Sequence, residues 1–151
     1  MGLDMYLERR HYVKQWDHIA VDKQFAVTVT RGGKPYTAID PRRVSDVVEQ
    51  VAYWRKANAI HRWFVENVQK GQDDCGYYLV STEQLTELLT EVNAVLGGAN
   101  PAEVLPTQRG FFFGSLDYDE DYRCDLEDTK RQIEPLIEDG VDADYYYHAS
   151  W

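Results

Sequence analysis

The chain has 151 residues, a length typical of a single domain; 44% of its residues are apolar, and its net charge is −10. No segment approaches the roughly 18 consecutive apolar residues of a membrane-spanning helix, and two cysteines are too few for a disulfide framework, which excludes a membrane protein and a secreted disulfide-rich scaffold. Residues 1–70 carry a charge of +4 and residues 71–151 a charge of −14, a field that disfavours direct binding to nucleic acid or to an anionic membrane.

The first third of the sequence predicts three strands. Residues 3–13 alternate loosely between apolar and polar side chains, which favours a strand. Residues 25–30, with the sequence FAVTVT, are rich in β-branched side chains and predict a second strand. The turn-forming residues 31–34, RGGK, then predict a hairpin into a third strand at residues 35–39, where Pro35 indicates an edge position.

The next segment carries the longest helical pattern of the chain. Asp40 suits the N-cap of a helix and Pro41 its first turn, and Lys70 and Gly71 suit its C-terminal end. Drawn at 100° per residue, the segment has apolar side chains on two opposite sides. We therefore expect a helix from about Val44 to Gln69 that is the central packing element of the fold.

The second half of the chain predicts two further helices. Ser81 and Gln84 form a capping-box pattern ahead of leucines at helical spacing, and Gly97 ends that helix. Residues 117–139 repeat apolar side chains every three or four positions, and Asp117 would cap their helix. The segments between and after these helices predict, in chain order, a loop at 72–76, a strand at 77–80, a loop at 99–110, a buried strand at 111–113 and a last strand at 144–151. The pattern is that of an α+β fold, in which residues 1–151 form one domain with a mainly antiparallel sheet and about three helices.

Polar residues interrupt the apolar stripe of the predicted long helix. The stripe begins with valines, continues through Trp54 and then contains Arg55, Asn58 and Arg62, with His61 at its margin. A buried guanidinium group is costly unless it is paired and hydrogen-bonded. We therefore expect both arginines to be substantially buried and to make charge-assisted hydrogen bonds.

Three explanations for these arginines are open. They pair with carboxylates of the acidic second half, or they line a pocket for an anionic ligand such as phosphate, or the helix is rotated and they extend into solvent. The candidate internal partners are Asp73, Asp74, Asp117 and Asp119. The candidate ligand-binding residues are Trp54, Arg55, Asn58, His61, Arg62 and Gln108.

Other arrangements for catalysis or metal binding have weaker support. His61, Asp73, Asp74 and Cys75 could supply an acid, a base or a nucleophile, but no local signature accompanies them. The acidic residues 117–128 resemble a calcium loop, yet position six is Tyr122 where that loop needs glycine. We expect no structural metal, no cofactor and no disulfide.

Five sequence blocks resemble a known family. They are MGLDMYL at the start, VAYWRKANAIHRWFVENVQ at 51–69, GQDDCG at 71–76, LPTQRGFFFGSLDYDEDY at 105–122 and YYYHASW at the end. Together they are similar to a family of small uncharacterised bacteriophage and prophage proteins. The resemblance implies a phage-type accessory protein in the host cytoplasm and supplies no catalytic residues. The lack of a secretory signal pattern in the first ten residues also leads us to expect a cytoplasmic protein.

Three functions are compatible with the sequence, and we favour a non-enzymatic one. The first is a protein that binds a small anionic, nucleotide-like ligand, with sequestration of a host defence signal as its use; this use is an analogy with other small phage proteins. The second is an acidic interaction module that binds and inhibits a host protein through Asp121, Asp125, Glu127 and Asp128. The third is a small hydrolase-like enzyme in which His61 acts with Asp73 or Asp74. The sequence gives no indication of the oligomeric state.

Overall fold

The structure, a computed structural model that describes residues 2–151, confirms an α+β fold built on an antiparallel sheet. The main sheet has four strands in the spatial order β4 (Asp46–Arg55), β1 (Asp4–Tyr12), β6 (Asp144–Ser150) and β5 (Tyr78–Val80), and every neighbouring pair is antiparallel. The helices are α1 (Asn58–Asn67), α2 (Thr82–Leu96), α3 (Pro101–Val104) and α4 (Glu120–Glu138). None of the helices described is long and apolar enough to cross a membrane.

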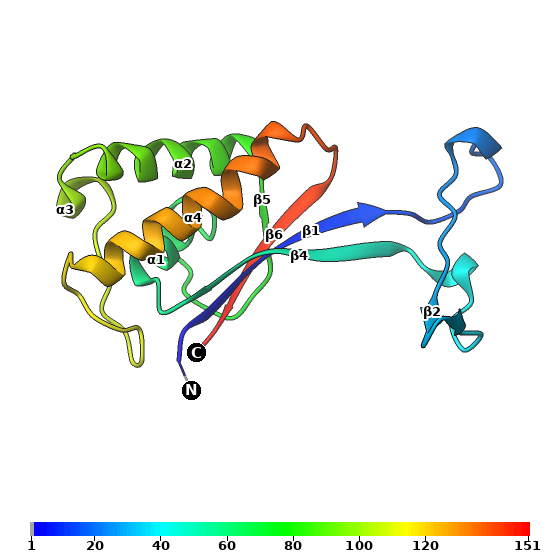
Figure 1. Cartoon of the computed structure of the whole chain (residues 1–151), viewed down its shortest axis with the longest axis horizontal. Coiled ribbons are helices and arrows are strands. Elements are labelled where there is room, and N and C mark those ends of the chain that lie inside the picture. The colour runs from blue at the N-terminus through cyan, green and yellow to red at the C-terminus, as the bar shows by residue number, and fades with distance from the viewer. Residues whose placement is uncertain (1) are drawn as a thin grey trace.

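The helices cover one face of the sheet (Figure 1). Alternate residues of the strands, such as Met5 and Leu7 of β1 and Tyr145 and Tyr147 of β6, join side chains of α1, α2 and α4 in one hydrophobic core. The intervening residues of the same strands lie on the other face, which none of the helices in residues 2–151 covers. Gln132 of α4 also accepts a hydrogen bond from the backbone N–H of Tyr53 and donates one to its carbonyl oxygen, which occupies the free edge of β4.

The predicted long helix from Val44 to Gln69 is wrong, because residues 46–55 form strand β4. Its valines are β-branched and pair with β1, and Val47 is exposed rather than buried. Lys56 then adopts a positive φ of 60°, which no helix continues through, and α1 begins only at Asn58. The central packing element is therefore the β1–β4–β6 sheet, and the longest helix is α4.

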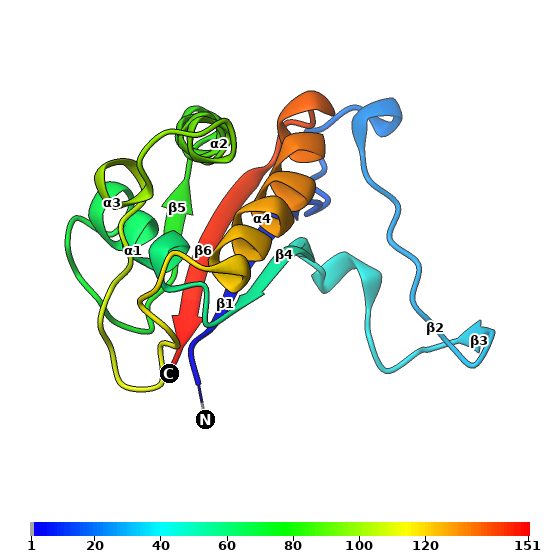
Figure 2. The ribbon, with the colours of Figure 1, turned by 60° about the vertical axis from the view of Figure 1, so that its left-hand side comes forward.

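Residues 13–45 form an arm that leaves the domain between the ends of β1 and β4 (Figure 1 and Figure 2). The predicted strands 25–30 and 35–39 are reduced to a minimal hairpin of β2 (Thr30–Arg31) and β3 (Lys34–Pro35). Its turn lies at Gly32 and Gly33, as predicted, and both have positive φ angles. Asp40 caps a short 3₁₀ helix, η2 (Pro41–Arg43), instead of a long α-helix, and a second one, η1 (Val21–Lys23), precedes the hairpin.

Most predictions for the second half are confirmed. The capping box of Ser81 and Gln84 is present on α2, and Gly97 follows the last residue of that helix. Strand β6 and helix α4 lie where their patterns place them, although Asp119 rather than Asp117 caps α4. The expected loop 99–110 contains the short helix α3.

The predicted buried strand at residues 111–113 does not form. Phe112 has a positive φ of 67°, so the chain turns there, and only Phe113 of the three phenylalanines is buried. Its ring lies so close to Gly110 that a Cβ atom on that residue would be 2.2 Å from it. The triplet is apolar because Phe113 covers the core beside α1, and not because it adds a strand to the sheet.

Candidate functional site

The two arginines predicted to share a buried site lie apart. Arg55 is the last residue of β4 and is exposed, while Arg62 lies on α1 and is only half-buried. The Nε atom of Arg62 donates to Glu66 Oε1 at 2.8 Å, and one of its terminal nitrogens donates to the carbonyl oxygen of Thr107 at 3.4 Å. The expected burial of Arg55 is wrong, because the break at Lys56 places it on a strand rather than on the face of the same helix.

Trp54 is also separate from the predicted ligand site. Its side chain is buried between the sheet and α4, where its Nε1 donates a hydrogen bond to Thr129 Oγ1 at 2.9 Å. This satisfied indole belongs to the core and has no free face on which a ligand could stack.

Four of the predicted site residues do come together around α1. The Nε2 atom of His61 lies 2.9 Å from Asp73 Oδ1, and Gln108 Nε2 donates to Asp73 Oδ2 at 3.1 Å. Asn58 accepts a hydrogen bond from the backbone N–H of Gln108 at 3.0 Å. Its amide donates to the carbonyl oxygens of Phe113 and Ser115, so the network fastens residues 107–115 to the start of α1.

The hydrogen bonds of His61 define its protonation. An ionised carboxylate only accepts, so Nε2 carries the proton toward Asp73, and Nδ1 accepts from the hydroxyl group of Tyr147 at 2.7 Å. Burial lowers the pKa of His61, with Asp73 acting in the opposite direction, and burial raises the pKa of Tyr147. Both groups are therefore neutral at pH 7.

The centre of this network is buried and already hydrogen-bonded. The rings of His61 and Tyr147 have no exposed surface, and Phe113 and Trp151 pack edge-on against the imidazole. Both nitrogens of His61 are already bonded, so neither remains to activate the thiol of Cys75, which is exposed and free. The network joins α1 and β6 to the two loops that carry Asp73 and Gln108.

Asp74, the remaining candidate, forms hydrogen bonds within its own loop. Its carboxylate accepts hydrogen bonds from the backbone N–H of Gly76 at 2.7 Å and from the hydroxyl group of Tyr78 at 2.9 Å. These bonds close the loop ahead of β5. Among residues 2–151, no group of three or more histidine, cysteine or acidic side chains is arranged to hold a metal ion.

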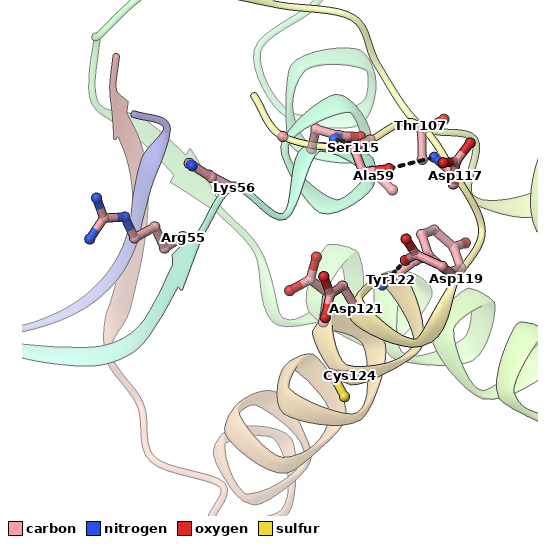
Figure 3. A pocket seen from close by; sticks show the side chains of 13 residues that line it. Arg55, Lys56, Ala59, Thr107, Ser115, Asp117, Asp119, Asp121, Tyr122 and Cys124 are labelled. Atoms are coloured by element: carbon pink, nitrogen blue, oxygen red, sulfur yellow. Dashed lines mark hydrogen bonds between the residues drawn. The ribbon is translucent and has the colours of Figure 1, made fainter. Parts of the chain in front are cut away.

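A pocket of about 290 Å³ opens between the β4–α1 junction and the start of α4 (Figure 3). Residues 107–117 form its third wall. Gly114 lets this wall approach Lys56 closely, because a Cβ atom on Gly114 would lie 3.2 Å from Lys56 Cβ. The lining residues are Arg55, Lys56, Asn58, Ala59, Thr107, Gly114, Ser115, Asp117, Asp119, Asp121, Tyr122, Cys124 and Asp125.

Four carboxylates line this pocket, and we call it the acidic pocket. Asp119 caps α4 by accepting from the backbone N–H of Tyr122, but Asp117, Asp121 and Asp125 form no ion pair with any residue from 2 to 151. Nearby cations are engaged elsewhere, with Arg123 bound to Glu127 and Arg131 bound to Asp128. In Figure 3, Arg55 and Lys56 point away from Asp121.

Asp125 has a raised pKa, mainly because it is partly buried. Burial, and to a smaller extent the neighbouring charges of Asp128, Asp121 and Asp119, raise the pKa of its carboxyl group to about 7. The four carboxylates outnumber the two cations of the lining, Arg55 and Lys56, and so favour the approach of a further cation. The pocket is thus better suited to a positively charged group than to phosphate.

The sequence identified part of this pocket. Asp121 and Asp125 are recognisable as members of one acidic helix face, because they are four positions apart. Lys56, Thr107 and Gly114 carry no local signal that places them opposite α4. Comparison with protein-family models, with curated proteins and with solved structures finds no match to this chain.

Proposed function

We propose that the protein is a non-enzymatic binding protein whose acidic pocket receives a lysine or arginine side chain of a basic partner protein. The observation that carries this proposal is the convergence of Asp117, Asp121 and Asp125 on one pocket without an internal ion pair. An ammonium or guanidinium group that entered the pocket would relieve their repulsion and donate charge-assisted hydrogen bonds to them. We place this function in the cytoplasm of a phage-infected or prophage-carrying host.

The size and charge of the pocket favour a side chain over a nucleotide. A volume of about 290 Å³ lies at the lower end of the range of small-molecule pockets. A nucleotide phosphate would also face four carboxylates against the two cations Arg55 and Lys56, and Arg62 is not part of the pocket. The anionic-ligand hypothesis therefore has less support than a basic partner, and the buried state of His61 gives an enzyme less support again.

The net charge of the chain adds a long-range contribution. Residues 71–151, which include α2 and α4, carry 18 acidic and 4 basic side chains. Such a field increases the rate at which a basic protein encounters the surface, and the pocket then fixes one of its cations. The proposed binding should therefore weaken as the salt concentration rises.

Peptide binding tests the proposal. A fluorescein-labelled peptide rich in lysine and arginine is titrated with the wild type, with Asp121→Asn/Asp125→Asn and with Asp142→Asn, which removes an exposed charge outside the pocket. We expect the double variant to bind at least about tenfold more weakly and Asp142→Asn to bind like the wild type. Wild-type binding should also tighten from pH 6 to pH 8, because Asp125 loses its proton across that range.

Two results would contradict the proposal. One is equal peptide affinity in the wild type and the double variant. The other is a rise in melting temperature with anionic nucleotides and none with the basic peptide, which would return the anionic-ligand hypothesis to first place.

A further inference from the structure

The arm, residues 13–45, has apolar side chains but no core. Val21 is 85% exposed and Phe25 56% exposed, and Trp16 and Ile39 are also exposed. None of the residues 13–45 belongs to the hydrophobic core that the sheet shares with the helices. The arm is held together by polar bonds such as that from Gln24 Nε2 to the carbonyl oxygen of Ile19 at 2.7 Å.

A second apolar surface is unpartnered in the same chain. We define the open face as the sheet surface opposite the helices, and its centre is a row of rings across neighbouring strands. Tyr6 stacks on His148 with ring centroids 4.8 Å apart, His148 stacks on Tyr77 at 4.1 Å, and Tyr53 lies on the other side of Tyr6 at 5.4 Å. Leu79 of β5 extends this surface and is 60% exposed.

The arm and the remainder of the chain carry opposite charges. Residues 13–45 contain six basic and three acidic side chains, a charge of +3, while the other residues contain 10 basic and 23 acidic side chains, a charge of −13. The open face carries both signs of charge, because Asp4 and Glu8 alternate with Tyr6 along β1 and Arg10 follows on the same face. Arg10 pairs with Glu8 and lies over the rings of Tyr77 and Tyr146. The arm is therefore complementary to the open face in polarity, and opposite in charge to the rest of the chain as a whole.

The arm does not reach the open face of its own chain. It leaves from the ends of β1 and β4 and continues outward from the sheet, at the end remote from the two termini (Figure 1). The view in Figure 2, turned by 60°, shows the same separation between the arm and the domain. An identical open face is available on a second copy of the chain.

We infer that the protein forms a dimer in which the arm of each copy lies on the open face of the other. Exchange of identical elements between two copies produces a closed, two-fold arrangement in which both contacts are the same. Each contact covers exposed apolar side chains of the arm and rings of the sheet, while the charges of arm and domain attract one another.

Sedimentation equilibrium over a range of protein concentrations tests this inference. The arm variant is Trp16→Ser/Phe25→Ser, and the sheet variant is Tyr77→Thr/Leu79→Thr. The matched control is Phe111→Ser, which removes a side chain that is 79% exposed and belongs to neither surface. We expect a dimeric wild type and control, and a dissociation constant at least about tenfold higher in either double variant.

Removal of the whole arm gives an independent variant. The backbone N–H of Val13 donates to the carbonyl oxygen of Ser45 at 2.8 Å, which continues the β1–β4 ladder to the base of the arm. Replacement of residues 14–44 by Asn-Gly therefore closes β1 and β4 with a two-residue hairpin turn. This variant should keep the circular dichroism spectrum of the folded sheet and helices and should be a monomer.

Mixing the two double variants identifies the surfaces that meet. In a mixed dimer, the intact arm of the sheet variant faces the intact sheet of the arm variant, so one of the two contacts is restored and the mixture should associate more strongly than either variant alone. An arm variant that dissociates while the sheet variant stays dimeric would overturn the arm-on-sheet contact in favour of arm-to-arm contact. A wild type that is monomeric at all concentrations would overturn the inference entirely.

This result is independent of the proposed function. The acidic pocket lies between the β4–α1 junction and α4, and its aspartates are on neither the arm nor the open face. Asp121→Asn/Asp125→Asn should therefore leave the dissociation constant of the dimer unchanged, and the arm variant should bind the basic peptide like the wild type.

Discussion

The Nδ1 atom of His61 on α1 lies 2.7 Å from the hydroxyl oxygen of Tyr147 on β6, and neither residue has exposed surface. The ring of Tyr147 also stacks on Phe64 of α1, with centroids 3.9 Å apart. This pair joins the middle of the sheet to the first helix by one hydrogen bond and one aromatic contact. The free energy of unfolding should therefore depend on the hydroxyl oxygen of Tyr147.

Tyr147→Phe should lower the free energy of unfolding by about 1–3 kcal/mol, because it leaves a buried nitrogen of His61 without a partner. Urea denaturation followed by circular dichroism measures the change. Tyr146→Phe is the matched control, since this neighbour lies on the opposite face and none of the residues described bonds to its hydroxyl group. Equal stability of the two variants would contradict the role given to the His61–Tyr147 bond.

His61 should be neutral at pH 7, with its proton on Nε2, because burial lowers its pKa below that of a free imidazole, which is about 6.5. Nitrogen-15 NMR of the imidazole distinguishes the tautomers. Since the unfolded chain then binds more protons than the folded one, the free energy of unfolding should fall as the pH drops below about 6.5. This fall is best measured in the Asp125→Asn variant, because protonation of Asp125 changes the free energy of unfolding in the opposite direction. A His61 that is charged at pH 7 would exclude the assigned hydrogen-bond directions.

Thr129→Val should destabilise the fold by about 1–3 kcal/mol, because it removes the acceptor of the buried indole N–H of Trp54 while nearly preserving the shape of the side chain. Thermal and urea denaturation measure the loss. The same substitution at Thr90, an exposed position of α2, should change the free energy of unfolding by less than about 0.5 kcal/mol. A similar effect at both positions would indicate a change in helix propensity rather than a lost hydrogen bond.

Asp125→Asn should stabilise the protein at pH 8 and have little effect near pH 4. The folded-state pKa of about 7 lies above that of an unfolded aspartate, so ionisation between pH 4 and pH 7 favours the unfolded chain. Solvent screening of this half-buried group limits the gain to about 1–2 kcal/mol. Urea denaturation at the two pH values measures the difference between variant and wild type. A gain that is independent of pH would show that the carboxyl group is not the cause.

Elements with a local signal were predictable from the sequence. The capping box of Ser81 and Gln84 fixed the start of α2, and apolar residues at helical spacing located α4 to within a few residues. The glycines at 32 and 33 located the hairpin turn, because their positive φ angles are a property of that residue type. The α+β class follows from these elements, since each signal lies within a few residues of the structure that it specifies.

The candidate site was predictable only in part. Asn58, His61 and Gln108 were expected in one ligand site and Asp73 as an ion-pair or catalytic candidate, and the structure joins the four in one network. The arginines were expected in the same ligand site and lie apart, since their position depended on whether residues 44–55 were helical. The acidic pocket forms where the β4–α1 junction, residues 107–117 and α4 lie together. These segments are far apart in the sequence, so no local pattern predicts their contact.

The sequence by itself determined the capping box of α2, the turn at Gly32 and Gly33 and the charge asymmetry, all of which arise from neighbouring residues. Only the tertiary structure decided that Val47 and Val48 belong to a strand, because the strand that pairs with them is β1, about 40 residues earlier. A helix satisfies its backbone groups within four residues, whereas a strand depends on a partner that the local sequence does not contain. Because residues 46–55 pair with β1, Arg55 lies on the edge strand of the sheet and not on a helix. The arm and the acidic pocket are then the surfaces available for binding.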